Sequence, residues 1–409
     1  TPEAVDEASD RERFESFSQR NDLRMPNGQT ASTPDEVREA VREIGYPVLI
    51  RPSYVLGGRG MEILSSNRQL ETYMEDAFLS PEKPLLVDEY LGNAVELDVD
   101  AVCDGREVLV GAIMEHLEEA GIHSGDSTCF IPPQNVSDDI LKQVDEWTRK
   151  IGIELGIRGC YNIQFAIRDE VLYVLEVNPR GSRTFPFVAK ATGVPLARIA
   201  AMVALGEKLS DLNIPKPQND AVCVKAPVFP FIKLRGLDPA PGPEMKSTGE
   251  VMGSHERASA AYLKARLATE SPVPTEGGVY ITVKDTDKDS IIQQAKSLID
   301  LGFKIYATRG TANVLRVKGG LEVETCYRIT EGMTPDALDL MRQGKIHLII
   351  NTPRNTGGAV LDGNMMRRLA VELNIPFVTT MAGARMEVMA IAEAMDGIPE
   401  PRLLKIGTL

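Results

Sequence analysis

The first 270 residues mix segments with the two-residue period of strands and segments with the longer period of helices. A helix is expected over residues 34–44, because Thr33-Pro34-Asp35-Glu36 forms a capping box and Gly45 stops the helix. Further helices are expected at 1–21, 137–156 and 192–206, and strands at 48–51, 85–90, 95–103, 108–114, 161–167 and 171–177. This part of the chain is therefore predicted to be an α+β region, which the Pro- and Gly-rich linker 270–278 ends.

The pattern after this linker changes to a regular alternation of strands and helices. Strands are expected at 279–283, 304–307, 347–351 and 377–380, and helices at 288–301, 335–343, 363–373 and 384–394. Strands separated by helices of this length predict a parallel sheet with helices on its faces. The fold class predicted for the whole chain is thus α/β and α+β multidomain.

The segment 160–183, CYNIQFAIRDEVLYVLEVNPRGSR, carries the clearest chemical pattern. Its two strands flank the charged turn Arg168-Asp169-Glu170, which predicts a β-hairpin with Gln164 opposite Glu176. Alternation along the second strand puts Asn178 on the same face as Glu176. One carboxylate and two amide oxygens are hard ligands that suit Mg²⁺, so this face is a predicted metal site.

Two arginines follow this hairpin. Arg180 and Arg183 come after Pro179 has ended the second strand, where they can reach an anion held by the metal. The alternative is a solvated strand face with a salt-bridged Glu176. The combination of acid, amides and arginines favours the metal site over that alternative.

A glycine-rich loop, RPSYVLGGRG, follows the predicted strand at 48–51. It lacks the spacing of a Walker A loop, but its glycines allow a backbone to lie close over phosphates. We interpret it as a hairpin lid over a nucleotide, with an ordinary turn as the alternative. The strand at 85–90 ends where backbone groups near Glu89 and Leu91 can hold a base and ribose.

The next strand, 95–103, alternates apolar and acidic residues. Its acids Glu96, Asp98 and Asp100 share one face, and Asp98 and Asp100 are expected to be solvated. A loop is expected at 115–126, with the histidines His116 and His123 in it. These histidines do not have the pattern of a transition-metal site, and His123 has either a phosphate-contacting, hydrogen-bonding role or a purely structural one.

Ligands of a parallel sheet lie outside the carboxyl ends of its strands. In the second part of the chain those ends carry Thr308-Arg309-Gly310-Thr311, Asn351-Thr352-Pro353-Arg354 and Thr379-Thr380. The first is a hydroxyl-rich turn that is expected to open a helix at Thr311, which suits a phosphate at a helix N-terminus. No convincing general base accompanies it, since His347 is expected to be a core histidine. This region is therefore predicted to bind a small phosphorylated ligand rather than to be an enzyme.

Composition narrows the class of protein further. The chain has 409 residues, 43% hydrophobic and 25% charged, which predicts a globular protein of two or three domains. Its formal net charge of −14 argues against a nucleic-acid-binding surface but not against nucleotides. Five scattered cysteines favour reduced thiols and a cytoplasmic location, and no apolar run approaches the length of a membrane span.

Several segments, in this order and spacing, resemble the C-terminal part of the carbamoyl phosphate synthetase large subunit. They are RPSYVLGGRG, EHLEEAGIHSGDS, YNIQFA, LEVNPRGSRTFPFVAKATGVPLA and PGPEMKSTGEVMG, and the resemblance runs over the whole chain. It implies an ATP-grasp domain at 1–210, the remainder of the synthetase unit and a linker at 211–270, and a Rossmann-like, methylglyoxal-synthase-like regulatory domain at 271–409. In this family the ATP-grasp unit phosphorylates carbamate to carbamoyl phosphate, for pyrimidine and arginine biosynthesis.

The resemblance also implies site residues. Catalytic roles fall on Arg180 and Arg183. Metal ligands fall on the three hairpin residues Gln164, Glu176 and Asn178, for Mg²⁺ or Mn²⁺, with K⁺ as a further cation. Contacts to ATP fall on Arg11, Arg51, Glu89, Leu91, Glu96, Gly121, Ile122, His123, Ser124, Gln164 and Glu176.

The implied effector site takes a nucleotide monophosphate and comprises Lys288, Thr308, Thr311, Arg328 and Asn351, with Arg328 where a lysine is usual. Pro353 stands where some members have a threonine. Residues that match an ornithine site in some members are Glu118, Asp126, Glu244, Thr379 and Thr380.

The implied partners are a glutamine amidotransferase small subunit, which makes the enzyme glutamine-hydrolysing, and an N-terminal synthetase half. The resemblance thus implies that this chain is a fragment of a longer polypeptide or one piece of a split enzyme. Two alternatives remain: another ATP-grasp carboxylate ligase, against which the C-terminal β/α domain argues, and a nucleotide-binding regulatory fragment without turnover.

Overall fold

The computed structural model describes residues 1–52, 60–77, 84–218, 220–231, 239–352 and 358–400. Most of the glycine-rich loop, with Gly57 and Gly58, lies outside these residues, as does Pro353. The chain divides into two compact units, of which the first holds Thr1–Cys223 and Pro241–Met245, and the second holds the other described residues from Val224 onward. The domain boundaries at 210 and 270 remain predictions.

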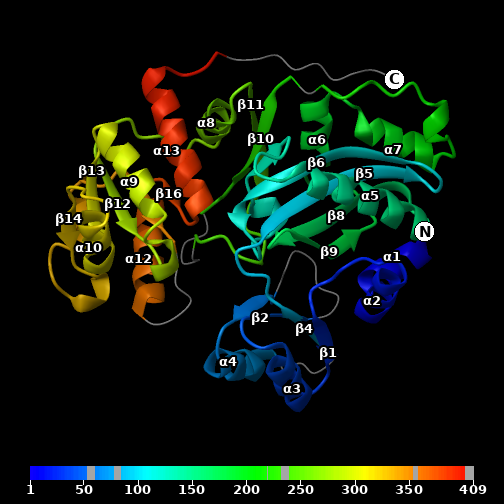
Figure 1. Ribbon diagram of the computed structural model, residues 1–409, viewed down its shortest axis with the longest axis horizontal. Coiled ribbons are helices and arrows are strands. Elements are labelled where there is room, and N and C mark those ends of the chain that lie inside the picture. Colours follow the sequence, from blue (N-terminus) through cyan, green and yellow to red (C-terminus); the bar gives the residue numbers. More distant parts are fainter. Residues whose placement is uncertain (53–59, 78–83, 219, 232–238, 353–357, 401–409) are drawn as a thin grey trace. The chain divides into compact units, whose positions relative to one another are not determined.

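A small antiparallel sheet forms one part of the first unit (Figure 1). Its strand order is β1-β4-β2-β3, from β1 (Gly28–Ala31), β2 (Val48–Pro52), β3 (Glu62–Leu64) and β4 (Leu85–Glu89). Helices α3 (Pro34–Ile44) and α4 (Asn67–Ala77) accompany it, and its core includes Val37, Ile50, Leu70 and Val87. The predicted capping box of Thr33 and Glu36 is confirmed, as is the stop at Gly45.

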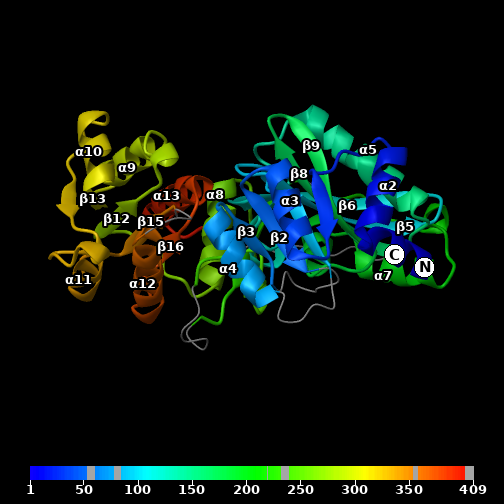
Figure 2. The ribbon, with the colours of Figure 1, turned by 90° about the horizontal axis from the view of Figure 1, so that it is seen from below.

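The main sheet of the first unit has the consecutive strands β7-β6-β5-β8-β9. These strands are β5 (Val95–Asp104), β6 (Val108–Glu119), β7 (Cys129–Ile131), β8 (Arg158–Arg168) and β9 (Val171–Asn178). One face packs against α1 (Pro2–Ser9), α2 (Arg11–Arg20) and α5 (Asp138–Glu154), and Figure 2 shows α2 and α5 beside this sheet. The buried contacts include Phe14, Phe17, Val144, Ile163 and Phe165. This apolar packing leaves the opposite face for polar side chains.

The helix predicted at 192–206 is present as α7 (Leu196–Ala204). Another helix, α6 (Phe185–Thr192), precedes it and was not predicted, and left-handed Gly193 ends it. One sequence-based expectation about the strands of this unit was wrong. Strand β6 continues to Glu119, so His116 lies in a strand and not in the expected loop. The end of this strand lacks the usual alternation of buried and exposed positions, because the three consecutive residues Met114–His116 are all buried.

The second unit contains a five-stranded parallel sheet of order β14-β13-β12-β15-β16, which confirms the predicted β/α alternation. Its strands are β12 (Gly278–Thr282), β13 (Lys304–Thr308), β14 (Glu324–Cys326), β15 (Leu348–Asn351) and β16 (Phe377–Val378). The helices of this region are α9 (Ile291–Asp300), α10 (Arg309–Val317), α11 (Ala337–Arg342), α12 (Gly358–Glu372) and α13 (Met381–Asp396). Two buried clusters, one around Ile281 and one around Tyr280, cover the two faces.

Strands β10 (Val222–Val228) and β11 (Gly249–His255) precede this sheet, and helix α8 (Ala258–Ala268) follows them. Helix α8 packs against α13, where buried Glu387 accepts a hydrogen bond from Tyr262 at 2.8 Å and lies 3.2 Å from Arg266. Helix α10 starts at Arg309 and not at Thr311, with Thr308 as its N-cap. His347 is exposed and precedes β15, so the core role predicted for it was wrong.

In the described part of the chain, no single helix has the length and apolar character needed to cross a membrane. Helices α6 and α7 meet that test only as a pair, and they are bent by 117° relative to each other.

Candidate functional site

The predicted hairpin is present as β8 and β9, with Gln164 directly opposite Glu176 as expected. The turn residues Asp169 and Glu170 both have positive φ, which is typical of a two-residue hairpin turn. Asn178 lies on the same face as Glu176, and its Nδ2 donates to Glu176 Oε1 at 2.7 Å. The metal-ligand types that the sequence predicted are therefore adjacent in space.

Strand β5 extends this arrangement into two rows across three strands. Asp98 pairs with Gln164, which pairs with Glu176, and Asp100 pairs with Asn162, which pairs with Asn178. Directly opposed residues have Cβ atoms about 5 Å apart. The polar face of the sheet thus holds carboxylates and amides in a fixed grid.

This grid borders a cavity of about 200 Å³ in the first unit. Part of its wall is apolar, from Leu49, Leu91, Ile122, Ala166 and Leu175, which suits a planar base. Of the residues predicted for catalysis, metal and ATP, all except Arg183 line it: Arg11, Arg51, Glu89, Leu91, Glu96, Gly121, Ile122, His123, Ser124, Gln164, Glu176, Asn178 and Arg180. Side chains separated by up to 169 positions in the chain therefore lie around one space.

Asp88 is a lining residue that the sequence interpretation missed. Its Oδ1 lies 2.9 Å from Arg11 Nη2, and its Oδ2 lies 3.8 Å from Arg51 Nε. Arg51 Nη1 is also 4.0 Å from Glu176 Oε2. Asp88 therefore orients two arginines beside the predicted metal ligands, and its position in the strand sequence LLVDEY next to Glu89 was the available signal.

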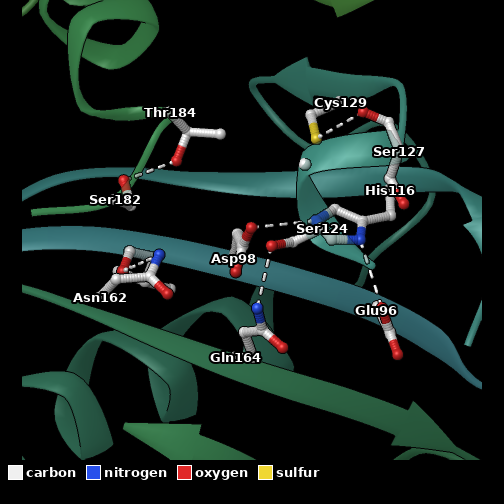
Figure 3. Close-up of polar contacts among 12 residues, drawn as sticks. Glu96, Asp98, His116, Ser124, Ser127, Cys129, Asn162, Gln164, Ser182 and Thr184 are labelled. Carbon is white, nitrogen blue, oxygen red and sulfur yellow. Dashed lines mark hydrogen bonds and ion pairs between the residues drawn. The ribbon is translucent and has the colours of Figure 1, made fainter. Parts of the chain in front are cut away.

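The expectation that Asp98 and Asp100 are solvated was wrong, because both are fully buried. Asp98 Oδ2 lies 3.3 Å from His116 Nε2, and Glu96 Oε2 lies 3.4 Å from His116 Nδ1 (Figure 3). Burial alone lowers the pKa of His116, but Cys129 and the carboxylates of Asp98 and Glu96 raise it well above its usual value. The imidazolium thus compensates the charge of two buried acids, which alternation in the sequence could not reveal.

Glu96 also orders the cavity wall. Its Oε1 accepts a hydrogen bond from Gly121 N at 3.0 Å, and Tyr90 Oη donates to Ala120 O at 2.6 Å. These bonds hold the chain at Ala120–Gly121 against the end of the strand that precedes Tyr90. Backbone groups of this wall are therefore positioned before a ligand binds.

His123 and Ser124 form the next part of the wall. Gly125 N donates to His123 Nδ1 at 3.0 Å. Gln164 Nε2 donates to Ser124 Oγ at 3.0 Å (Figure 3). Burial lowers the pKa of His123, so its ring is neutral at neutral pH and its Nε2 is a donor. The side-chain amide of Gln164 then has its oxygen left for a cation.

The two predicted arginines occupy different places. Arg180 Nη2 donates to Asn178 Oδ1 at 3.2 Å, within the cavity lining. Arg183 is exposed and lies next to the His123 loop, where its Nη1 is 2.9 Å from Met245 Sδ. A Cβ on Gly125 would be 3.3 Å from Arg183 Nη1, a tight contact with the end of this flexible side chain.

The residues matched to an ornithine site fall in both units. Glu118 Oε2 accepts from Thr128 N at 2.5 Å, and burial raises the pKa of Glu118. Asp126 is fully buried in the same unit, whereas Glu244 is exposed. Thr379 and Thr380 follow β16 in the second unit, where Thr380 caps α13 through Gly383 N at 2.9 Å.

The second unit has its own cluster at the carboxyl ends of the parallel strands. Thr282 and Thr308 end adjacent strands with their hydroxyls 3.3 Å apart, and Asn351 Nδ2 donates to Thr282 O at 3.3 Å. A Cβ on Gly310 would lie 3.1 Å from Lys288 Nζ, which places that ammonium over the start of α10. The predicted effector residues Lys288, Thr308, Thr311, Arg328 and Asn351 all lie at or after these strand ends.

Comparison with protein families gives two matches. Residues 10–212 match "Carbamoyl-phosphate synthase L chain, ATP binding domain", and residues 290–379 match "MGS-like domain". The first match covers the cavity strands, and the second covers strands β13 to β16 of the parallel sheet.

Similar curated proteins extend over almost the whole chain. The carbamoyl phosphate synthase large chain, C-terminal section, of Methanocaldococcus jannaschii is 48% identical over 97% of this chain and 66% of its own length. The carbamoyl phosphate synthase large chain of Methanoculleus marisnigri is 47% identical over 96% of this chain and 37% of its own length. This chain thus spans between about a third and two thirds of these relatives.

Solved structures share the fold at low identity. The biotin carboxylase domain of Hydrogenobacter thermophilus 2-oxoglutarate carboxylase, in complex with MgADP, has a TM-score of 0.53 at 18% identity, covering 65% of this chain and 66% of that one. Carboxyaminoimidazole ribonucleotide synthase from Aspergillus clavatus, complexed with ATP, has a TM-score of 0.53 at 16% identity, covering 65% and 73%. The first unit therefore has the ATP-grasp fold, as predicted, and the chain belongs to the carbamoyl phosphate synthase large-chain family.

Proposed function

We propose that the synthetase part of this chain, residues 1–270, transfers a phosphoryl group from ATP to carbamate and so forms carbamoyl phosphate. The observation that carries this proposal is the set of Gln164, Glu176 and Asn178, which lines one apolar-walled cavity together with Arg51 and Arg180. Phosphoryl transfer depends on positioning and on neutralising charge around the transferred group, and these residues supply both. Carbamate is itself the nucleophile, so the reaction does not need a nucleophilic side chain.

The donor set fits Mg²⁺, which prefers oxygen ligands and keeps several waters. Glu176 would hold the ion, with the amide oxygens of Gln164 and Asn178 beside it. A bound Mg²⁺ would offset negative charge on the phosphates of the nucleotide. Mn²⁺ would replace it at the same oxygens, and K⁺ is proposed as a further cation.

The protein side chains would then act on the nucleotide and the product. Arg51, oriented by Asp88, would contact the phosphates next to Glu176. Leu91, Ile122 and Ala166 would hold the base, and Glu96 would hold the wall at Gly121 while facing the ribose. Arg180 and Arg183 would bind the transferred phosphoryl group.

The regulatory part, residues 271–409, is proposed to bind a nucleotide monophosphate at Lys288, Thr308, Thr311, Arg328 and Asn351. Ornithine is proposed as a second effector, at Glu118, Asp126, Glu244, Thr379 and Thr380. The proposed partners are an N-terminal synthetase half and a glutamine-hydrolysing small subunit, in the cytoplasm. They would supply carbamate to this site.

The experiment is luminescent detection of ATP formed from MgADP and carbamoyl phosphate by this chain. Wild-type protein is expected to form ATP above the background of Arg183→Ala, whereas Arg20→Ala, an exposed arginine paired with Glu7, is expected to match wild type. No ATP, together with a nucleotide-induced rise in melting temperature, would support the alternative of a nucleotide-binding regulatory fragment. ATP formation that Arg183→Ala does not reduce would contradict the assigned site. The other alternative, a different ATP-grasp carboxylate ligase, is disfavoured by the MGS-like match at 290–379.

A further inference from the structure

The second row of the polar grid contains a buried acid that the proposed mechanism does not use. Asp100 lies on β5, is completely buried, and shares its row with Asn162 and Asn178. It is absent from the lining of the cavity. A buried carboxylate is costly unless hydrogen bonds compensate it, so its partners indicate what it does.

Those partners come from β8 and from the segment between β9 and α6, where the side chain of Ser182 is a partner of Asp100 as well as that of Thr184. Asn162 Nδ2, on β8, donates to Asp100 Oδ1 at 3.0 Å, and Thr184 Oγ1 donates to Asp100 Oδ2 at 2.8 Å. The hydroxyl of Thr184 is also 2.9 Å from that of Ser182 (Figure 3). Thr184 is the N-cap of α6, yet its side chain does not cap that helix. The hydroxyl is directed to Asp100 instead.

The segment that this bond ties down is short. It runs from Asn178, at the end of β9, to Thr184, at the start of α6, and it carries both arginines. At its first end Arg180 N donates to Asn178 O at 2.7 Å, and at its other end Thr184 bonds to Asp100. The arginines are therefore on a loop with one end on the metal-ligand strand and the other end on a buried anion.

We propose that Asp100 is a positioning residue that fixes the Arg180–Arg183 loop relative to the metal ligands, through Thr184. This inference rests on the proposed phosphoryl transfer. A satisfied buried network holds its members in one arrangement, and a displacement of about 1 Å in a positioning group can cost roughly 100-fold in rate.

The decisive comparison uses two substitutions at Thr184. Thr184→Val keeps the shape and removes the hydroxyl, whereas Thr184→Ser keeps the hydroxyl. Thr184→Val is expected to lower kcat for ATP formation on the order of 10-fold with little change in KM for MgADP, and Thr184→Ser is expected to stay close to wild type. Asp100→Asn is expected to lower kcat on the order of 100-fold, and the double variant Asp100→Asn/Thr184→Val no further.

Glu115 offers a matched control. It is also buried on the main sheet, and it accepts hydrogen bonds from Asn135 N and Nδ2 at 2.8 Å. The loop that contains Asn135 carries neither Arg180 nor Arg183. Glu115→Gln is expected to lower stability without changing kcat. Equal loss of kcat in Asp100→Asn and Glu115→Gln would show a merely structural role and overturn the proposal.

Hydrogen exchange of the peptide that contains residues 179–184 tests the inference even if the chain forms no ATP. Thr184→Val and Asp100→Asn are expected to speed its exchange at least about 10-fold, while Thr184→Ser and Glu115→Gln leave it unchanged. Exchange of this peptide at the wild-type rate in Thr184→Val would overturn the proposal. If the wild-type chain forms no ATP while Thr184→Val and Asp100→Asn exchange faster, the proposed transfer reaction is rejected and the positioning role is kept.

Discussion

The two candidate phosphate sites of this chain lie on sheets of opposite construction. In the first unit the site is on the face of an antiparallel sheet, where β5, β8 and β9 present acids and amides in rows. In the second unit it is at the edge of a parallel sheet, where hydroxyls, a lysine and the start of α10 meet. The face of a sheet can hold carboxylates side by side, as a metal needs, whereas an edge presents strand ends and backbone N–H groups.

This difference predicts different chemistry for the same kind of ligand. The first site is expected to need a divalent cation, because Glu176 and Asp88 would otherwise repel phosphates. The second is expected to bind a phosphate directly, through Lys288 and the N–H groups of α10. The following predictions test that contrast.

The largest effect is expected for Glu176→Gln. Loss of the only carboxylate in the proposed ligand trio should lower Mg²⁺-dependent ATP formation by on the order of 1,000-fold and leave the fold intact. Glu170→Gln, at the exposed turn of the same hairpin, is the control and should be silent. An unchanged rate in Glu176→Gln would contradict the metal assignment.

A pH effect is expected from Asp100, because burial raises its pKa from 3.8 to about 6. The carboxyl of Asp100 has the lower pKa in the unfolded chain, so on raising the pH the unfolded state loses the carboxyl proton before the folded state does. The free energy of unfolding should therefore fall as the pH rises from about 4 to about 6, by at most about 3 kcal/mol. Urea unfolding of wild type and Asp100→Asn across this range measures it. The advantage of wild type over the variant should shrink with rising pH, and a constant difference would contradict the prediction.

A smaller effect is expected for Lys288→Ala. Removing its ammonium from the start of α10 should weaken nucleoside monophosphate binding by about 10-fold, with or without Mg²⁺, as measured by calorimetry. Lys318→Ala is the control, since Lys318 pairs with Asp289 at the end of the same helix. Equal affinity in Lys288→Ala and wild type would move the effector site elsewhere.

The smallest effect is expected for Thr311→Ala, where one buried hydroxyl is lost. Effector binding should weaken by about 5-fold, corresponding to about 1 kcal/mol, while MgADP affinity stays unchanged. An equal fall in both affinities would show that the two sites are not separate.

The hairpin part of the candidate site was predicted from a local pattern, whereas Arg11, Gly121, Ile122 and Ser124 were implied only by the family resemblance. The turn at Asp169 and Glu170 and the period of the two strands were sufficient to place Gln164 opposite Glu176. Likewise, the β/α alternation after residue 278 predicted which strand ends would lie at one edge. Local patterns succeed where turn chemistry and period determine the neighbour.

The errors share a different cause. Asp98 and Asp100 alternate with apolar residues as solvated acids do, but both are buried in the structure, where β5 lies between β6 and β8 and contacts α7. His116 was assigned to a loop because its strand carries polar residues that are satisfied by neighbours far along the chain. Burial of a charged residue depends on long-range partners, so periodicity alone mispredicts it.

The sequence was sufficient to identify the family, many of the strands and helices, and the hairpin residues that face the cavity. The tertiary structure was needed to show which acids line the cavity and which lie buried behind it. Asp88 orients Arg11 and Arg51, His116 compensates Glu96 and Asp98, and Asp100 bonds to Thr184. The physical reason is that hydrogen bonds and ion pairs are made across sheets and between elements, at distances that neither period nor composition records.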